Sequence, residues 1–121
     1  MADSPWNVRR AIQNLQQAGL LTLEALHRAD ADTVRALITP SGFYNVKYRR
    51  LRHLLDYLAA QPDGWNRLRT APLEILREEL LAIHGIGPET ADSILLYAFE
   101  RPTFVVDAYT RRLFGRLGER W

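Results

Sequence analysis

Apolar residues recur along most of the chain at intervals of three and four positions. Three sets follow the spacing i, i+3, i+4, i+7, one near each end of the chain and one in the middle. They are Val8, Ala11, Ile12 and Leu15; Leu51, Leu54, Leu55 and Leu58; and Ala91, Ile94, Leu95 and Ala98. Because this spacing gathers side chains on one face of a helix, it predicts six or seven short amphipathic helices and an all-α fold.

Residues that favour helix starts precede the predicted helices. They are Ser4 before Pro5, Thr22, Asp30 or Asp32, Asn45, and Thr70 before Pro72. The one strand-like segment is TFVV at 103–106, whose β-branched residues end at Asp107. We predict that this segment is extended but too short to form a sheet, and that Asp107 caps the helix that follows it.

Length and composition predict a single helical domain spanning residues 1–121. A chain of 121 residues with 47% hydrophobic content can bury one core. The chain has no cysteine, which excludes disulfides, thiol catalysis and a cysteine-ligated iron–sulfur cluster, and its three histidines have no metal-ligand spacing. No apolar run approaches the roughly 20 residues of a membrane span. We therefore expect no side-chain metal site, no membrane association and a cytoplasmic location.

The excess of basic residues lies in two segments. The net charge is only +2, although the sequence pI is about 9.3. Residues 1–46 carry four basic and four acidic side chains, so the excess lies in KYRRLR at 47–52 and RRLFGR at 111–116. Both segments are candidates to contact nucleic-acid phosphates. Most of the cations of the first segment are expected to face solvent around their helix; the four are Lys47, Arg49, Arg50 and Arg52.

The segment LLAIHGIGPETADSILLYAF combines two apolar helices with a glycine turn. Gly85 and Gly87 flank the apolar Ile86, which can fill the space between the helices, and Pro88 is placed at the first helical position. Glycine lets a phosphate approach the backbone, and the N–H groups at a helix N-terminus attract anions. We predict a helix-hairpin-helix element at about 73–99 that binds a nucleic-acid backbone. The alternative is a glycine that ends one helix before an unrelated helix begins.

The segment IHGIGPETADSILLYAFERPTFVVDAYTRRLFGRLG resembles the hairpin and catalytic segment of the endonuclease III family of DNA glycosylases. The resemblance continues upstream through residues 7–26 and 40–54, so it covers nearly the whole chain. The VVDAY motif and the missing hairpin lysine are most similar to the monofunctional branch that removes alkylated bases such as 3-methyladenine. The resemblance implies the helical barrel domain of helix-hairpin-helix glycosylases, truncated at both ends and without most of the second helical domain.

Two acidic residues stand at positions that matter for catalysis in this family. The resemblance implies that Asp107 is the essential carboxylate, which would stabilise the positive charge on the sugar and orient or deprotonate the attacking water. Glu89 occupies the position of the lysine that forms a Schiff base in bifunctional relatives. Because a carboxylate cannot form that imine, the resemblance implies base excision without strand cleavage. The structural alternatives are a helix N-cap for Asp107 and a first-turn acid for Glu89.

Phe43, in the turn SGFYN, matches the family loop whose apolar residue wedges into the base stack when a nucleotide is extruded. The alternative is that its ring covers the core. Arg111 and Arg112 follow Asp107 and are predicted to contact phosphates, with a solvated face as the alternative. Four other aromatic residues are expected to belong to the core; they are Tyr48, Tyr57, Trp65 and Phe99.

The resemblance implies double-stranded DNA as the partner, at the nucleoid, and a monovalent cation held by carbonyls of the hairpin loop. Full-length relatives insert a glutamine beside the extruded base. That glutamine should lie at or just before Met1, where the sequence does not reproduce it. The face left by the missing domain is expected to be apolar and to favour self-association. Two alternatives to a glycosylase are a DNA-binding module without catalysis and an inactive fragment.

Overall fold

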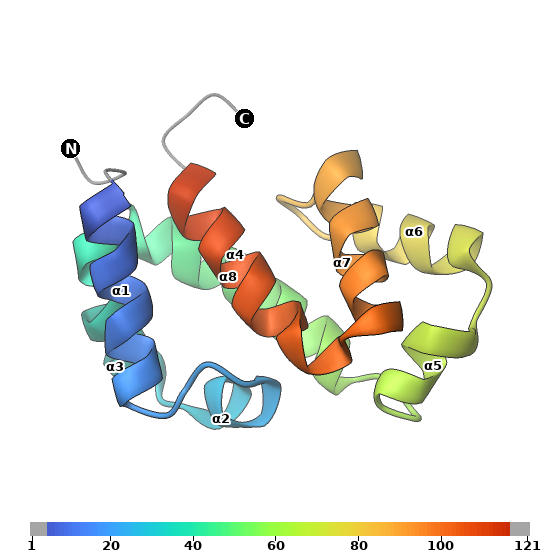
Figure 1. Cartoon of the computed structure of the whole chain (residues 1–121), viewed down its shortest axis with the longest axis horizontal. Coiled ribbons are helices and arrows are strands. Elements are labelled where there is room, and N and C mark those ends of the chain that lie inside the picture. Colours follow the sequence, from blue (N-terminus) through green and yellow to red (C-terminus); the bar gives the residue numbers. More distant parts are fainter. Residues whose placement is uncertain (1–4, 117–121) are drawn as a thin grey trace.

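A computed structural model describes residues 5–116 of the chain (Figure 1). This part consists of helices and contains no strand, so the prediction of an all-α fold is confirmed. The α-helices are α1 (Pro5–Gln17), α2 (Leu23–Arg28), α3 (Ala31–Ile38), α4 (Tyr44–Ala59), α5 (Trp65–Thr70), α6 (Leu73–Leu81), α7 (Pro88–Glu100) and α8 (Val105–Arg116). Two short 3-10 helices, η1 (Thr39–Ser41) and η2 (Pro102–Phe104), precede α4 and α8. The described residues thus hold eight α-helices, more than the predicted six or seven, because the short α5 was not expected.

The helices form two groups joined by a central pair. In Figure 1, α1, α2 and α3 lie at one end and α5, α6 and α7 at the other, while α4 and α8 run between them. α4 packs against α2, α3 and α8, and α7 packs against α5, α6 and α8. The central pair therefore connects the N-terminal group to the glycine hairpin formed by α6 and α7.

The three predicted apolar sets meet in one hydrophobic core. Every member is buried except Val8, which is partly buried against the core. Ile86 is 5% exposed and fills the space behind the glycine turn as predicted. Among the aromatic residues, Tyr48 is buried and Tyr57 and Trp65 are partly buried, but Phe99 is 62% exposed, so its assignment to the core was wrong.

The predicted helix starts are confirmed at two positions. Thr22 caps α2 by accepting a hydrogen bond from the Ala25 N–H at 3.2 Å, and Asp30 caps α3 by accepting one from the Thr33 N–H at 3.2 Å. Ser4 lies outside the described residues, as do the expected glutamine position at Met1 and Gly118.

Two other predicted starts were wrong. Phe43 rather than Asn45 precedes the first residue of α4, and Pro72 precedes α6. Thr70 instead ends α5, where its hydroxyl donates to the Asn66 carbonyl at 2.8 Å. A hydroxyl bonded back to the preceding turn is satisfied within its own helix and is not available to cap the next one.

The segment at 103–106 is helical, so the prediction of an extended segment was wrong. The Phe104 N–H donates to the Arg101 carbonyl at 2.9 Å, which closes η2, and α8 begins at Val105. Val105 and Val106 are buried in the first turn of α8. Packing of these side chains into the core outweighs their preference for strands. Asp107 is therefore inside the first turn of α8 and is not its N-cap.

No helix in residues 5–116 is long and apolar enough to cross a membrane.

Candidate functional site

The glycine hairpin joins α6, which ends at Leu81, to α7, which begins at Pro88. Gly85 has φ +94°, a conformation that favours glycine, whereas Gly87 has an ordinary φ of −93°. Gly87 is the N-cap of α7, and its carbonyl accepts from the Ala91 N–H at 2.9 Å. No side chain caps this helix. Its first N–H groups are therefore placed to meet an anion from outside.

The Arg50 side chain of α4 lies close to Gly85 of the hairpin. A Cβ atom added to Gly85 would lie 2.8 Å from Arg50 Nη1 and 3.0 Å from its Cδ. Arg50 and Arg52 are partly buried and Lys47 is buried, so the expectation that most of these cations face solvent was wrong. A side chain at Gly85 would thus adopt a strained backbone conformation and would also displace the Arg50 side chain.

Asp107 lines a surface pocket of about 230 Å³ at the start of α8. The other residues of this pocket are Tyr97, Arg101, Phe104, Ala108 and Arg111. The Asp107 side chain is 28% exposed, and its Oδ1 accepts a hydrogen bond from Nε of Arg111, one turn further along α8. The Arg101 guanidinium lies over the Phe104 ring at 5.4 Å from its centroid. The pocket thus combines one carboxylate with two guanidinium groups and two aromatic rings.

Arg112 connects α8 to the N-terminus of α7. Its Nε donates to Thr90 Oγ1 at 3.1 Å, and its Nη2 lies 3.3 Å from Glu89 Oε1. The Glu89 side chain is 82% exposed. The structure therefore pairs Arg112 with Glu89 and Arg111 with Asp107. Each pair has one largely exposed partner, Arg111 or Glu89, and partly exposed pairs of this kind contribute little to stability.

Two pockets lie along the contact between α7 and α8. A small second pocket is lined by Thr90 and Arg112 near the hairpin and shares Tyr97 and Ala108 with the Asp107 pocket. Tyr97 is partly buried and stands where the two pockets meet. Sequence analysis did not single out Tyr97, Arg101 or Phe104, because only the packing of α7 against η2 and α8 brings them to the carboxylate.

Phe43 lies in an exposed turn before α4. Its φ is +48° and its side chain is 54% exposed, so the alternative that its ring covers the core was wrong. The preceding Gly42 also has a positive φ, of 75°. A bulky residue with positive φ is uncommon and indicates that the surrounding structure holds the turn in place.

A family model described as "HhH-GPD superfamily base excision DNA repair protein" matches residues 6–120. The chain belongs to this superfamily. The resemblance to endonuclease III-like helix-hairpin-helix glycosylases is thereby confirmed over nearly the whole chain.

Three relatives illustrate this membership. The chain is 46% identical to "Putative DNA repair glycosylase MJ1434" of Methanocaldococcus jannaschii over 119 residues, which are 96% of this chain and 54% of that protein. It is 34% identical to "Endonuclease III homolog 2, chloroplastic" of Arabidopsis thaliana, covering 89% of this chain and 26% of that protein. It is 30% identical to "Endonuclease III" of Sulfolobus acidocaldarius, covering 85% of this chain and 44% of that protein. The chain thus spans about half or less of each of these relatives, and no solved structure gives a significant match.

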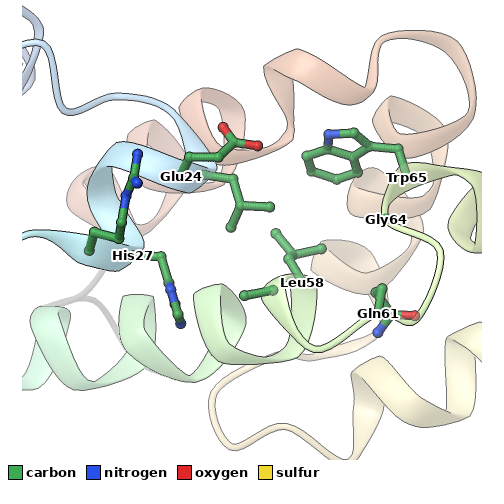
Figure 2. A pocket seen from close by; sticks show the side chains of 9 residues that line it. Glu24, His27, Leu58, Gln61, Gly64 and Trp65 are labelled. Atoms are coloured by element: carbon green, nitrogen blue, oxygen red, sulfur yellow. The ribbon is translucent and has the colours of Figure 1, made fainter.

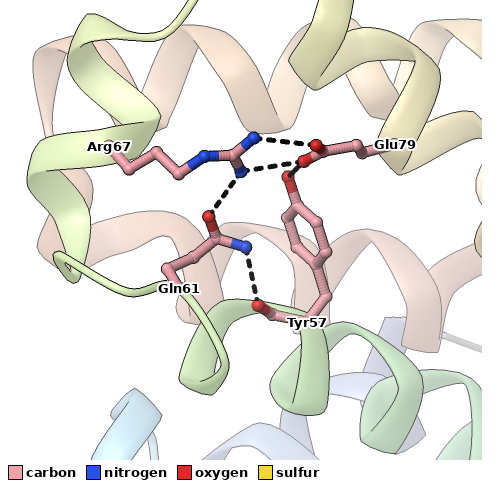
Figure 3. A network of polar contacts seen from close by, with 4 residues as sticks. All are labelled: Tyr57, Gln61, Arg67 and Glu79. Carbon is pink, nitrogen blue, oxygen red and sulfur yellow. Dashed lines mark hydrogen bonds and ion pairs between the residues drawn. The ribbon is translucent and has the colours of Figure 1, made fainter.

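A polar network fixes α6, the first hairpin helix of this HhH-GPD protein, to α4 and α5 (Figure 3). Glu79 of α6 accepts from Tyr57 Oη at 2.7 Å and from both terminal nitrogens of Arg67 at 2.8 and 2.9 Å. Gln61 accepts from Arg67 Nη1 at 2.7 Å. The hydrogen bonds from Arg67 and then Tyr57 lower the pKa of Glu79 to about 2, while burial and then Glu79 raise the pKa of Tyr57. The network therefore holds the hairpin as long as Glu79 is ionised.

A further pocket lies away from the predicted site. It has a volume of about 410 Å³ between α2, the end of α4 and α5, and Figure 2 shows His27, Leu58 and Trp65 around it. Neither Asp107 nor the hairpin glycines line it. In residues 5–116 no group of three or more His, Cys, Asp or Glu side chains is arranged to hold a metal ion.

Proposed function

We propose that this HhH-GPD protein is a monofunctional DNA glycosylase of base excision repair, and that it removes a damaged, alkylated base from double-stranded DNA. The observation that carries this proposal is the Asp107 pocket beside a helix-hairpin-helix whose lysine position holds Glu89. The 46% identity to a protein named as a DNA repair glycosylase supports it. Alkylated bases are the proposed substrate because the VVDAY motif and the absent lysine resemble the branch that acts on them.

Asp107 would act on the sugar of the extruded nucleotide. As the bond between C1′ and the base nitrogen breaks, the base leaves with the bonding electrons and positive charge develops on the sugar. The Asp107 carboxylate stabilises this charge and accepts a proton from the water whose oxygen forms the new bond to C1′. The hydrogen bond from Arg111 orients the carboxylate in the pocket. The products are the free base and an abasic site in an intact strand.

DNA would be held by backbone N–H groups of the hairpin at Gly85 and Gly87 and by Arg111 and Arg112. These groups contact phosphates without reading sequence. Phe43 would fill the gap that the extruded nucleotide leaves, which offsets part of the few kcal/mol that unstacking costs. Its exposed ring on a turn with positive φ supports this role.

The presence of a glutamate at position 89 supports a glycosylase that hydrolyses the bond to the base and does not cleave the strand. A lyase needs an amine that attacks C1′ and forms an imine, and the first turn of α7 offers a carboxylate at the matching position. Glu89 also lies 3.3 Å from the Arg112 guanidinium, which is not deprotonated in proteins and cannot act as that amine.

The monovalent cation and the self-association that we expected remain proposals. The hairpin loop offers backbone carbonyls and, within the described residues, no carboxylate cluster, which suits a weakly held monovalent ion. No step of the proposed reaction depends on that ion. Leu96 and Phe99 are exposed one turn apart near the end of α7, and we propose self-association through this apolar part of the helix.

A DNA-binding module without catalysis is the second candidate. It is favoured because the chain spans 54% of the archaeal relative and the described Asp107 pocket is built only from α7, the residue after it, η2 and α8. A base pocket needs walls that exclude water and orient the base.

The deciding experiment measures base release from duplexes that each carry one alkylated base. Strand breaks are scored after hot alkali, with an untreated aliquot as the test for lyase activity. We expect alkali-dependent breaks with the natural chain, none with Asp107→Asn, and unchanged activity with Asp63→Asn. Asp63 is an exposed aspartate in the turn before α5 and lines neither pocket between α7 and α8. Duplex binding without any base release would support the second candidate, and breaks without alkali would contradict a monofunctional enzyme.

A further inference from the structure

Lys47 is a fully buried cation in the first turn of α4. Its side chain is 0% exposed, and it is the largest of the fully buried side chains in residues 5–116. It is therefore one of the cations at 47–52 that do not face solvent. Its Nζ donates to the Ser41 carbonyl at 2.8 Å and to the Phe114 carbonyl at 2.9 Å.

These two carbonyls belong to two different elements, each of which contains or precedes a residue of the proposed site. Ser41 ends η1 and is followed by Gly42 and Phe43, the turn that carries the exposed ring. Phe114 lies near the C-terminus of α8, the helix that begins next to Asp107. The last carbonyls of a helix have no partner within it and carry a partial negative charge. The Lys47 ammonium group thus donates one hydrogen bond to a carbonyl near the end of α8 and another to a carbonyl at the start of the turn.

The geometry of this contact is tightly defined. Hydrogen bonds from an ionised donor are short and directional, and a buried charge that loses a partner is strongly destabilised. Ser41 is itself 0% exposed, and its hydroxyl donates to the Ile38 carbonyl at 2.9 Å, which anchors the turn on its other side. The turn cannot shift relative to α8 without breaking these bonds.

We propose that Lys47 is a positioning residue that sets the place of Phe43 relative to α8 and Asp107, so that the ring enters the stack where the extruded nucleotide meets the carboxylate. The proposal rests on the proposed function for the role of the ring. An apolar residue of similar volume would fill the same space in the core, and it would leave the two carbonyls unconnected. Stability alone therefore cannot reveal this role, because replacing a buried charge with an apolar group can stabilise or destabilise a protein.

The first test needs no DNA. Chymotrypsin cleaves after exposed aromatic residues in mobile turns, and the fragments are identified by mass. We expect Lys47→Met to speed cleavage after Phe43 about tenfold relative to cleavage after Phe104 in the same sample, as loss of a charge-assisted hydrogen bond allows. Arg69→Met, which removes an exposed cation of α5, should leave that ratio unchanged. An unchanged ratio in Lys47→Met contradicts the proposal.

The second test measures base extrusion with a duplex that contains 2-aminopurine, whose fluorescence rises when it leaves the stack. Lys47→Met should lose most of the rise, as Phe43→Ala does, and the double variant should lose no more than Phe43→Ala alone because both act through one ring. Duplex binding at low salt should be retained. Wild-type extrusion by folded Lys47→Met contradicts the proposal.

Lys47→Arg supplies the test if Lys47→Met does not fold. It keeps the charge and the donors, but its longer, planar head displaces the turn from α8. We expect faster cleavage after Phe43 and weaker extrusion in this variant, and wild-type values for both contradict the proposal. If the natural chain itself extrudes no base, the proposed function fails, while the positioning role of Lys47 is still decided by the cleavage ratio.

Discussion

The Arg112 guanidinium lies 3.3 Å from the Glu89 carboxylate, across the contact between α8 and α7. The resemblance to endonuclease III-like glycosylases implies that bifunctional relatives have a lysine at the position of Glu89. The side chain is 82% exposed, so its ion pair contributes little to stability and the position tolerates other polar residues. A single substitution at position 89 therefore tests whether the proposed site can carry out lyase chemistry.

Glu89→Lys should allow a covalent complex with DNA that contains an abasic site. The new amine can attack C1′ to form an imine, which borohydride reduces to a stable cross-link. We expect a cross-linked band on a denaturing gel with Glu89→Lys, and none with the natural chain or with Glu89→Gln. A band from the natural chain would contradict monofunctional hydrolysis, and no band from a Glu89→Lys protein that binds the duplex would show that position 89 does not face the sugar.

Gly85→Ala should destabilise the hairpin more than Gly87→Ala, which loses only the preference for glycine over alanine at the N-cap of α7. At Gly85 a side chain meets both a φ of +94° and the Arg50 guanidinium, so we expect a loss of about 1–3 kcal/mol in the free energy of unfolding. At Gly87 φ is negative and no atom lies within 4 Å of an added Cβ. Thermal denaturation compares the two variants directly. Equal melting temperatures would mean that the turn adapts and that its geometry is not fixed by Arg50.

Acid should weaken the protein through Glu79. The folded pKa of about 2 lies below the ordinary value of 4.5, so the network contributes stability above pH 4.5 and loses it as the pH falls toward 2. Because the side chains of Glu79 and Arg67 are about a third exposed, we expect a loss of only about 1–2 kcal/mol. Urea denaturation between pH 2 and pH 7 measures it. Glu79→Gln should be less stable at pH 7 and should lack this part of the pH dependence, and an identical pH profile would contradict the prediction.

Local sequence patterns predicted most of the fold because helix periodicity and capping depend on near neighbours. The buried faces of α1, α4 and α7 and the caps at Thr22 and Asp30 needed no knowledge of distant residues. The segment at 103–106 was predicted to be extended because its β-branched residues favour strands. Burial of Val105 and Val106 against other helices stabilises the helical conformation instead, and the local sequence does not reveal this burial.

The site was less predictable, because its contacts join distant parts of the chain. Lys47 lies four residues before Leu51, which places it on the apolar face of α4, but its partner Phe114 is 67 residues away and could not be predicted from the segment KYRRLR. Arg50 likewise lies against a glycine of another element. The positions of Asp107 and Glu89 came from a motif, but their pairing with Arg111 and Arg112 depends on how α7 and α8 pack.

Arg111→Met should weaken duplex binding and reduce its dependence on salt. The Arg111 side chain is 51% exposed beside the Asp107 pocket, where it can leave the carboxylate for a phosphate of the bound strand. Each phosphate contact releases counterions, so removing one should lower the slope of log K against log salt by about 1. Fluorescence anisotropy at several salt concentrations measures this slope, with Arg69→Met as the control for loss of one exposed cation. If Arg69→Met lowers the slope equally, Arg111 acts only through net charge; if neither does, Arg111 serves Asp107 alone and DNA is held elsewhere.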